Sequence, residues 1–545
     1  MSNTKVPTEE QQKIIDYNGN LAVIADPGSG KTYTLAIKIQ KILENLPNYK
    51  GVIAISYTNK ASDELKSRVL LGGIDSKNSY FGTIDSFFYS ELILPFLPRI
   101  LDIQLNKEIE TIRLKDIQKD NENDFKELEN LLQTKTIKEI HLNIVKKFLL
   151  QGVFFLELFG LIGLYTFKNS KTASKYLKAR YSHIIIDEYQ DSGIEQHQFF
   201  KELVDLSLIG IAVGDINQSI YRWAGKNPLY LKELQENSKF KSYLLTKNHR
   251  SHESIVAYSR TFLLPQVEIP ELKTKRVYYK QVQGNQENIA KWIDINIENI
   301  IQKFEINKKS SIAILVRNSL SGKIVNDTLT TTHKYIENTE LDTCSQIWAR
   351  LFSDLLFYSF DMGQCASNII EKWTLYDLNL SYKNLLKGYL NTLKRLDRED
   401  LKDNINIFVN IAEILCPNNK SEVAYNCLKK VINDENLLNS YIPVKDDEMQ
   451  IMTIHKSKGL EFDVIFHLDL YKSVLPAKQS HNDTKKMEED KNLHYVGITR
   501  AKKCCFLLTS TKNIVNYKGE MQEWNSNPSE FLEKINLISL RHNLK

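Results

Sequence analysis

A glycine-rich segment near the N-terminus, residues 25–32, carries side chains suited to phosphate chemistry. It follows the apolar run 21–24, which predicts a short buried strand. It precedes residues 35–43, whose apolar side chains recur at helical spacing. A strand, a glycine-rich loop and a helix that opens with Lys-Thr are together typical of polyphosphate binding. The segment therefore predicts a nucleoside triphosphate site, and an ordinary turn before a helix is the less favoured interpretation.

Each residue of this loop has an expected part in binding the nucleotide. The glycines let the backbone approach a polyphosphate, and successive N–H groups at the helix N-terminus offer it partial positive charge. We expect Lys31 to bridge the β- and γ-phosphates of ATP and the Thr32 hydroxyl to bind Mg²⁺. Asp26 puts a carboxylate beside the anion, so its side chain should point away. The loop residues assigned to the nucleotide are Ala25, Gly28, Ser29, Gly30, Lys31 and Thr32.

A second stretch places two acidic residues directly after a buried strand. The continuous isoleucine run 184–186 ends in Asp187 and Glu188. Such a run predicts a parallel strand that presents carboxylates at its C-terminal end. We expect Asp187 to complete the Mg²⁺ shell through water, and Glu188 to orient or deprotonate the attacking water. An Asp-Glu pair alone means little, but after a phosphate loop it favours triphosphate hydrolysis.

Polar and aromatic residues follow another predicted strand, at residues 209–213. In an open parallel sheet, residues just beyond the strands face the ligand crevice. Gln218 is therefore placed to touch the γ-phosphate, and Tyr221 and Trp223 are placed to offer stacking faces for bases. An aromatic pair is more often part of a core, so the stacking role needs further support.

Gln11 allows two interpretations. Thr8 followed by Gln11 is typical of a capping box at a helix N-terminus. The Gln11 amide also offers one donor and one acceptor just upstream of the phosphate loop, which suits an adenine base. The residues themselves leave both interpretations open.

Length and composition narrow the class of protein. The chain has 545 residues, too many for one core, so we expect several domains; its net charge of +5 supports a nucleic-acid partner only weakly. The six cysteines form no Cys-x-x-Cys pair, and no signal pattern opens the chain, which favours a cytoplasmic protein without a zinc or iron–sulfur site. The longest apolar stretch, 152–165, is too short for a bilayer, so we expect a buried helix there.

The motifs, in their order along the chain, resemble those of the UvrD/Rep family of superfamily-1 DNA helicases. The most specific are Asp187-Glu188-Tyr189-Gln190-Asp191, Gly214-Asp215 with Gln218-Ser219-Ile220-Tyr221, His455 with Lys458-Gly459-Leu460-Glu461, and Thr499-Arg500-Ala501. The resemblance extends from residue 7 to about residue 532. It implies an ATP-hydrolysing DNA helicase that uses ATP and Mg²⁺ and moves 3′ to 5′ along single strands.

This resemblance also implies the architecture: an α/β fold with two RecA-like P-loop domains, each built on a parallel sheet and each carrying a helical insert. The first domain is expected at 1–88 and 165–245, with its insert at 89–164. The second is expected at 246–320 and 446–545, with a shortened insert at 321–445. ATP would bind in the cleft between the two domains.

Four residues correspond to positions that hold the nucleoside in this family. Gln11 matches the adenine reader, and His249 replaces the tyrosine that usually stacks on adenine, so stacking there would be less broad. Tyr33 occupies a position near the sugar that arginine often holds, and Glu461 resembles the ribose contact.

Two arginines complete the catalytic set that the resemblance implies. Arg250 and Arg500 resemble arginine fingers, whose fork suits charge developing on the transferred phosphoryl group. The expected catalytic residues are therefore Lys31, Glu188, Gln218, Arg250 and Arg500.

The resemblance also supplies single-stranded DNA contacts. Ala224 stands where many members have arginine, which weakens one contact and leaves Trp223 as the main stacking platform. The residues that match are Tyr57, Thr58, Asn59, Thr83, Tyr221, Trp223 and His455.

Three hypotheses for the biological role stay open. The first is a motor that translocates on single-stranded or tailed duplex DNA and works with a nuclease subunit in a hetero-oligomer, as short family members do in Gabija-type antiphage systems. The second is a DNA-sensing regulatory ATPase with little unwinding of its own. The third is a stand-alone repair helicase. A P-loop ATPase unrelated to nucleic acid is disfavoured by the block around Gln218 and Trp223.

Overall fold

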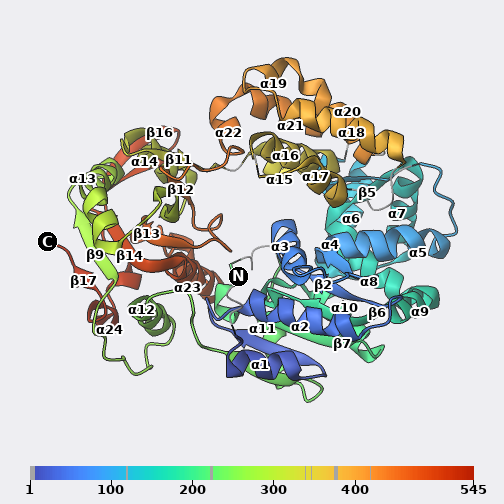
Figure 1. The fold of residues 1–545 in the computed structure, drawn as a ribbon, viewed down its shortest axis with the longest axis horizontal. Coiled ribbons are helices and arrows are strands. Elements are labelled where there is room, and N and C mark those ends of the chain that lie inside the picture. The colour runs from blue at the N-terminus through green and yellow to red at the C-terminus, as the bar shows by residue number, and fades with distance from the viewer. Residues whose placement is uncertain are drawn as a thin grey trace. The chain divides into compact units, whose positions relative to one another are not determined.

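Two compact units make up the fold (Figure 1). The computed structural model describes residues 6–107, 109–117, 121–220, 225–337, 339–344, 346–361, 363–373, 379–417 and 419–545, without the side chains of residues 59, 60, 116, 343 and 371. The first unit consists of Met1–Phe87, Lys171–Tyr335 and Lys445–Lys545, and the second of Phe88–Ser170 and Ile336–Val444. The first unit contains both large sheets, and the second is mostly helical.

The first sheet has six strands in the order β3-β2-β6-β7-β1-β8, and every neighbouring pair runs parallel. Its strands are short, largely buried apolar runs, because helices cover both faces. The strands are β1 (Leu21–Ala25), β2 (Gly51–Ile55), β3 (Tyr80–Gly82), β6 (Tyr181–Ile186), β7 (Ile209–Gly214) and β8 (Lys241–Leu245).

Alternation along β7 shows how the two faces of this sheet are covered. Ile211 and Val213 belong to the core formed with α1 (Glu9–Asp16), α2 (Lys31–Asn45) and α3 (Asn59–Val69). Gly210 points the other way, because successive residues of a strand alternate between faces. A Cβ atom built on Gly210 would lie 2.5 Å from Val204 of α10 (Ile194–Asp205). The remaining helices around this sheet are α4 (Ile84–Phe87), α9 (Lys171–Arg180) and α11 (Leu229–Glu236).

The second sheet has seven parallel strands in the order β11-β12-β10-β13-β14-β9-β17. The strands are β9 (Val277–Val282), β10 (Ile312–Val316), β11 (His333–Tyr335), β12 (Met449–Thr453), β13 (Phe462–His467), β14 (Ala501–Ser510) and β17 (His542–Asn543). The helices of this part are α12 (Glu253–Leu263), α13 (Gln286–Phe304), α14 (Ser319–Thr328), α23 (Thr484–Thr499) and α24 (Ile535–Ile538). An antiparallel hairpin, β15 (Lys512–Tyr517) with β16 (Glu520–Asn525), follows β14.

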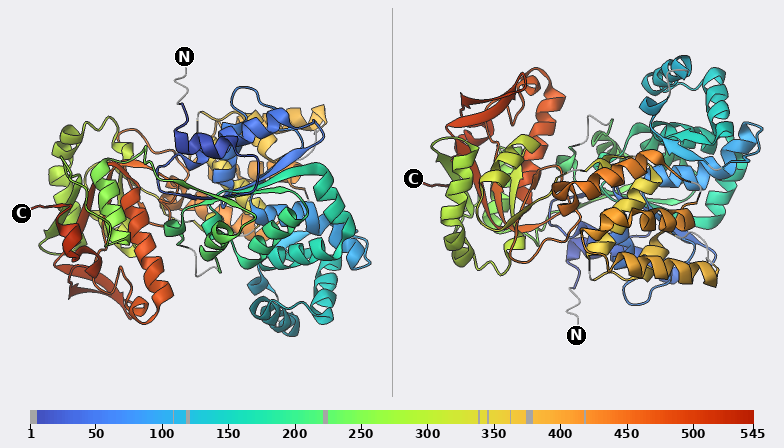
Figure 2. Two further views of the ribbon diagram at one scale, coloured as in Figure 1. Left: turned by 90° about the horizontal axis from the view of Figure 1, so that it is seen from below. Right: turned by 90° about the horizontal axis from the view of Figure 1, so that it is seen from above.

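The second unit is built mainly from helices, and those of its segment Ile336–Val444 surround an apolar core of their own. Its elements from the first segment are α5 (Leu94–Ile100), α6 (Glu122–Thr134), α7 (Glu139–Gln151), α8 (Phe159–Asn169) and the parallel pair β4 (Glu110–Ile112) and β5 (Val153–Phe155). The second segment supplies α15 (Glu340–Thr343), α16 (Ile347–Phe360), α17 (Ala366–Trp373), α18 (Leu380–Leu393), α19 (Asp400–Asp403), α20 (Ile405–Leu415), α21 (Glu422–Asn433) and α22 (Glu435–Asn439). Figure 2 shows these helices from two further sides.

The predicted fold class is confirmed, since the chain is α/β with two parallel sheets. The expected buried helix at 152–165 is wrong in its first half. Val153–Phe155 forms β5, which pairs with β4, and helix α8 begins only at Phe159. A β-branched residue followed by two phenylalanines suits a strand, and an apolar run alone does not distinguish a strand from a helix. The division of the first unit into two domains remains a prediction.

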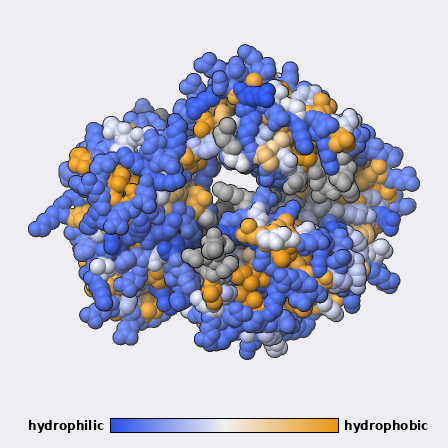
Figure 3. All heavy atoms as spheres, viewed as in Figure 1, coloured by the Kyte–Doolittle hydropathy of each residue, from blue (hydrophilic) through white to orange (hydrophobic). Residues whose placement is uncertain are grey.

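No described helix is long and apolar enough to cross a membrane. On the face drawn in Figure 3, hydrophobic residues lie in small groups within a mostly hydrophilic surface. Single exposed apolar residues of this kind are normal on folded proteins.

Candidate active site

The phosphate loop lies between β1 and α2 and needs glycine at two positions. Gly28 and Gly30 have φ angles of +71° and +81°, in the left-handed region. A Cβ atom on Gly28 would lie 2.7 Å from Cβ of Arg250, and one on Gly30 would lie 2.6 Å from Nε2 of Gln11. Ser29 is buried, and its Oγ has no hydrogen-bond partner among the described residues. The loop is therefore a tight cradle with an unsatisfied polar atom.

Lys31, at the start of α2, faces the two acids that follow β6. Its ammonium group pairs with Glu188 and lies 3.4 Å from Oδ1 of Asp187. Burial works to lower the pKa of Lys31, but the charges of Asp187 and Glu188 outweigh it and raise that pKa. Burial raises the pKa of Asp187 in spite of Lys31. In Glu188, burial is outweighed by Lys31 and Lys458, which hold its pKa low, so this carboxylate is ionised.

Glu188 has an unusual backbone conformation. Its φ is +56°, in the left-handed region that non-glycine residues adopt rarely. The strained residue lies two positions after the end of the buried strand β6 and precedes a short 3₁₀ turn, Tyr189–Asp191. Strained backbone of this kind occurs at functional sites when the surrounding structure supports it.

The side chains of Thr32, on the first turn of α2, and of Asp187, just after β6, fit a magnesium ion that is bound together with a nucleotide. A hydroxyl from Thr32 and a carboxylate from Asp187 are the oxygen ligands that Mg²⁺ prefers. Within the part of the chain that the structure describes, no group of three or more His, Cys, Asp and Glu residues could hold a metal ion. Phosphate oxygens and water would therefore have to complete the shell, as is usual for Mg²⁺ in triphosphate sites.

Gln218 follows β7 and reaches toward the second sheet. Its Nε2 donates to Oδ2 of Asp215 at 2.8 Å, and its Oε1 accepts from Nη2 of Arg500 at 3.0 Å. Arg500 follows α23 and is only 2% exposed. Burial, together with the charge of Arg250, lowers the pKa of Arg500 to about 10. The predicted finger Arg500 and the predicted phosphate sensor Gln218 are thus in direct contact.

Arg250 and His249 lie in the connection after β8, directly against the phosphate loop. The His249 N–H donates to the Gly28 carbonyl at 2.8 Å. Nη2 of Arg250 lies 2.6 Å from Oε1 of Glu461, while its buried Nε has no partner among the described residues. The predicted finger Arg250 therefore pairs with the predicted ribose contact Glu461.

Gln11 forms the capping box at the start of α1. Thr8 N–H donates to its Oε1 at 2.9 Å, and Gln11 N–H donates to Thr8 Oγ1 at 3.3 Å. The Gln11 Nε2 also donates to the Ser29 carbonyl at 3.0 Å, which ties α1 to the phosphate loop. The predicted capping box is therefore observed, and recognition of adenine by Gln11 stays a prediction. Tyr33, the residue expected near the sugar, is half-buried on the first turn of α2.

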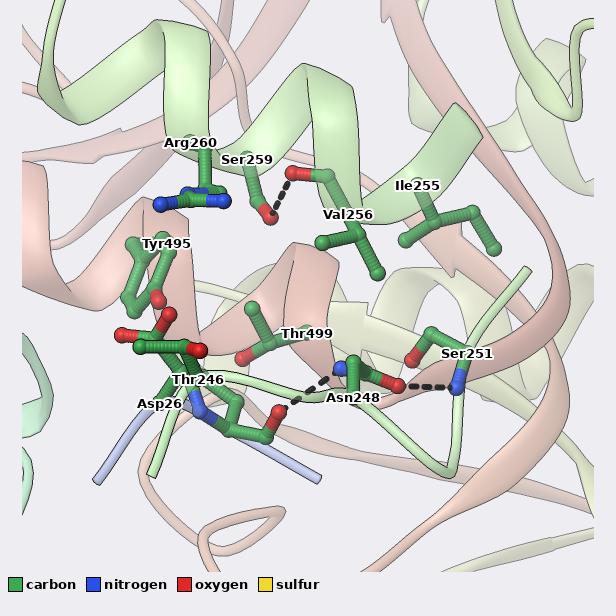
Figure 4. A pocket seen from close by; sticks show the side chains of 11 residues that line it. Asp26, Thr246, Asn248, Ser251, Ile255, Val256, Ser259, Arg260, Tyr495 and Thr499 are labelled. Atoms are coloured by element: carbon green, nitrogen blue, oxygen red, sulfur yellow. Dashed lines mark hydrogen bonds between the residues drawn. The ribbon is translucent and has the colours of Figure 1, made fainter. Parts of the chain in front are cut away.

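Asp26 lines a small pocket together with residues of α12 and α23 (Figure 4). Its carboxylate lies near Arg260 of α12 and Tyr495 of α23. Burial raises the pKa of Asp26, and the charge of Arg260 offsets this only in part. Asn248 closes another side of the pocket, with its Nδ2 donating to the Pro27 carbonyl at 2.7 Å.

Several residues predicted to contact DNA lie beside the catalytic acids. Tyr57 and Thr83 line one pocket together with Asp187 and Glu188, at the C-terminal edge of the first sheet. Thr58 is exposed, and its side chain caps α3 by accepting from Ala61 N–H at 3.2 Å.

Of the remaining residues predicted to contact DNA, the structure describes the side chain of His455 only. Tyr221 and Trp223 lie outside the described residues, as does the side chain of Asn59. His455 follows β12. Burial, with Arg317 and Lys458 nearby, lowers the pKa of His455 to about 4, so its ring is neutral.

Sequence reasoning missed four polar residues at this site. Asp215 is buried and holds Gln218, and burial raises its pKa to about 7. Lys458 donates to Asp191, and Asn492 donates to the Ser219 carbonyl. Three of the four lie in recognisable motifs, but the contacts of Lys458 and Asn492 join residues 240 to 273 positions apart, which no local pattern reveals.

A phosphate loop after a parallel strand, paired acids after another strand of the same sheet and an arginine from a second parallel sheet define a P-loop nucleoside triphosphatase. Two family models match the chain: an AAA domain at residues 11–224 and a UvrD-like helicase C-terminal domain at residues 364–512. Over these regions the chain resembles the UvrD/Rep-like helicases, and the similarity indicates an ATP-hydrolysing DNA helicase.

Three relatives show how far this similarity extends. The chain is 27% identical over 527 residues to Gabija protein GajB of Bacillus cereus (strain VD045), covering 93% of this chain and 96% of the relative. It is 24% identical over 644 residues to a probable DNA helicase II homolog of Rickettsia conorii, covering 97% and 95%. It is 24% identical over 605 residues to ATP-dependent DNA helicase Rep of Buchnera aphidicola subsp. Acyrthosiphon pisum, covering 90% and 92%.

Proposed function

We propose that this chain is an ATP-driven translocase that moves 3′ to 5′ along single-stranded DNA and works with a nuclease subunit in antiphage defence. The observation that carries the defence role is the similarity to GajB, which spans nearly the whole of both chains. The alignment to the Rickettsia relative extends over 644 positions, more than the 545 residues of this chain, so it contains insertions that this chain lacks. This supports the hypothesis of a compact motor with a shortened second insert.

ATP hydrolysis would use residues from both sheets. Lys31 would leave its acidic partners to hold the β- and γ-phosphates, and Glu188, ionised and freed from Lys31, would orient or deprotonate the attacking water. Thr32 and Asp187 would hold Mg²⁺, which when bound neutralises charge on the phosphates. Arg250 and Arg500 would stabilise the charge that develops on the transferred group.

The nucleoside would lie between α1 and the connection that follows β8. Gln11 would read adenine, His249 would stack on it, and Tyr33 and Glu461 would contact the sugar. Gln11 and Glu461 would each have to give up an existing contact, because the Gln11 amide is bonded to Thr8 and Glu461 is paired with Arg250.

DNA would pass the C-terminal edge of the first sheet, where Tyr57 and Thr83 share a pocket with the catalytic acids. Thr58, Asn59, Tyr221, Trp223 and His455 would complete the path. Stacking on aromatic side chains tolerates any sequence, because every base offers a π-face. Closure of the cleft around ATP and its opening after hydrolysis would then move stacked bases between alternating pockets.

A second candidate is a helicase that acts alone in repair, which the similarity to DNA helicase II and Rep supports. A third is a DNA-sensing regulatory subunit with little unwinding of its own. Affinity purification of the chain from its native cells, with identification of co-purifying proteins, separates these roles. A stoichiometric nuclease supports the proposal. Robust unwinding of 3′-tailed duplex by the purified chain, with no recovered partner, contradicts the dependence on a nuclease.

A further inference from the structure

The segment Gln218–Ser219 is held from the second sheet by three side chains. Lys458 Nζ donates to the Gln218 carbonyl at 3.1 Å, and Arg500 Nη2 donates to its Oε1 at 3.0 Å. Asn492 of α23 donates through Nδ2 to the Ser219 carbonyl at 2.9 Å. Arg500 already has an expected role at the phosphate, but Lys458 and Asn492 have none. Both of their contacts are with main-chain oxygens, so they fix the path of the segment whatever its side chains do.

Lys458 also bonds to the acidic turn of the first sheet. Its Nζ lies 2.5 Å from Oδ2 of Asp191, whose side chain is 0% exposed, while the lysine side chain is 11% exposed. A buried charge of this kind needs its partner, because removing one member leaves the other uncompensated. Asp191 ends the 3₁₀ turn that begins directly after Glu188, and its N–H donates to the Glu188 carbonyl at 2.9 Å. Lys458 therefore connects the turn that carries the catalytic acid to the segment that carries Gln218.

The same ammonium group lies beside a residue on the proposed DNA path. Lys458 Nζ is 5.8 Å from the centre of the Tyr57 ring, within the range of a cation–π contact. Its charge also helps to hold the pKa of Glu188 low, after that of Lys31. A movement of Tyr57 on DNA binding would therefore displace the ammonium group of Lys458. Displacement of Lys458 would in turn change the charge near Glu188 and the hydrogen bond to the Gln218 carbonyl.

We propose that Lys458 and Asn492 are positioning residues that hold the Gln218–Ser219 segment and couple DNA binding to ATP hydrolysis. Lys458 does this by bonding Asp191 and the Gln218 carbonyl at once, next to Tyr57. Asn492 supports the adjacent carbonyl from α23, the helix that ends at Arg500. The inference rests on the proposed DNA path past Tyr57.

The test measures ATP turnover of full-length Lys458→Met and Asn492→Ala, without DNA and with saturating oligothymidylate. We expect DNA stimulation to fall at least about tenfold in Lys458→Met, the equivalent of one charge-assisted hydrogen bond, with a smaller loss in Asn492→Ala. Affinity for a fluorescent ATP analogue should change less than about twofold, since neither residue is assigned to the nucleotide. Lys458→Arg should recover part of the stimulation, and adding Asp191→Asn to Lys458→Met should cost little more.

Lys239→Met is the matched control, because Lys239 forms an exposed ion pair with Asp205 at 2.8 Å. It should keep normal stimulation, and melting temperatures of all variants establish that they are folded. If Lys458→Met does not fold, Lys458→Gln and Asn492→Ser, which also remove these contacts, carry the same test. If DNA stimulates ATP turnover of the wild type and of both variants equally, the proposed coupling role is contradicted but the proposed function is not. If DNA does not stimulate ATP turnover of the wild type at all, the proposed function is contradicted as well.

Discussion

Glu188 combines a left-handed backbone, a position just beyond a buried strand and an ion pair with Lys31. These features favour an ionised carboxylate in a fixed position. Burial alone would raise the pKa of Glu188, and the charge of Lys31 outweighs that effect. The isoleucine run and the acids after it allowed this residue to be predicted from sequence. The contacts that Lys458 makes with Asp191 and Gln218 were not predictable, since Lys458 meets these residues only in three dimensions.

Glu188→Gln should keep ATP binding and lose turnover. The amide preserves the shape but accepts no proton, and loss of a general base commonly costs about 10²–10⁴-fold in rate. The measurement is steady-state hydrolysis with saturating single-stranded DNA, beside a binding titration with an ATP analogue. Glu64→Gln, which changes an exposed partner of Arg68, is the control. Near-normal hydrolysis by Glu188→Gln would remove this residue from the mechanism.

Arg250→Ala and Arg500→Ala should lower kcat more than they raise KM. Contacts that strengthen in the transition state appear mainly in kcat, and an arginine finger contributes about 10³–10⁵-fold. Loss of Arg500 also leaves Oε1 of Gln218 without the donor that holds it now. Arg68→Ala, at an exposed helix pair, is the matched control. A change confined to KM would show that these arginines only bind the nucleotide.

At the scale of elements, α23 and β13 meet through two buried histidines. Nδ1 of His494 lies 3.1 Å from Nε2 of His467, and both rings are fully buried. Burial lowers the pKa of His467 to about 4 and lowers that of His494 well below its usual value, so both are neutral in the fold. Since α23 directly precedes Arg500, His494 lies in the element that delivers the second finger.

Stability should therefore fall in mild acid. The unfolded chain binds protons at these histidines below about pH 6.5, whereas in the folded chain the pKa of His467 is about 4 and the pKa of His494 lies well below its usual value. The stabilisation is complete above pH 6.5 and is lost as pH falls, at up to about 1.4 kcal/mol per pH unit for each group. Urea unfolding at pH 7, 6 and 5 measures this slope. His494→Gln should flatten it, whereas His481→Gln, at an exposed histidine, should not. An unchanged slope in His494→Gln would contradict the account.

The elements themselves were partly predictable. Apolar runs before polar residues located β1, β6 and β7 of the first sheet, because fully buried parallel strands leave that pattern. The same pattern failed at Val153–Phe155, where pairing with β4, a contact between distant segments, selected a strand over a helix. The hydrogen bond from Gln11 to the Ser29 carbonyl is likewise a contact between distant segments. The sequence alone therefore did not decide between a helix cap and an adenine contact for Gln11.

At the scale of the whole molecule, the two sheets share one compact unit and the helical segments form another. Family resemblance predicted the order of these parts, whereas residues alone do not identify a partner, because fold does not determine the assembly in which a motor works. In the proposed function, a partner supplies surface for unwinding duplex. Movement along a single strand needs only the motor.

The most direct test of the central claim is displacement of streptavidin from biotinylated single-stranded DNA by the purified chain. A motor that moves 3′ to 5′ should remove streptavidin from a 5′-end biotin in the presence of ATP and Mg²⁺, with little effect at a 3′-end biotin. Glu188→Gln should displace neither, and the ATP analogue that cannot be hydrolysed should not support movement. The account is contradicted if DNA stimulates ATP hydrolysis by wild type but neither end is cleared, or if only the 3′ end is cleared.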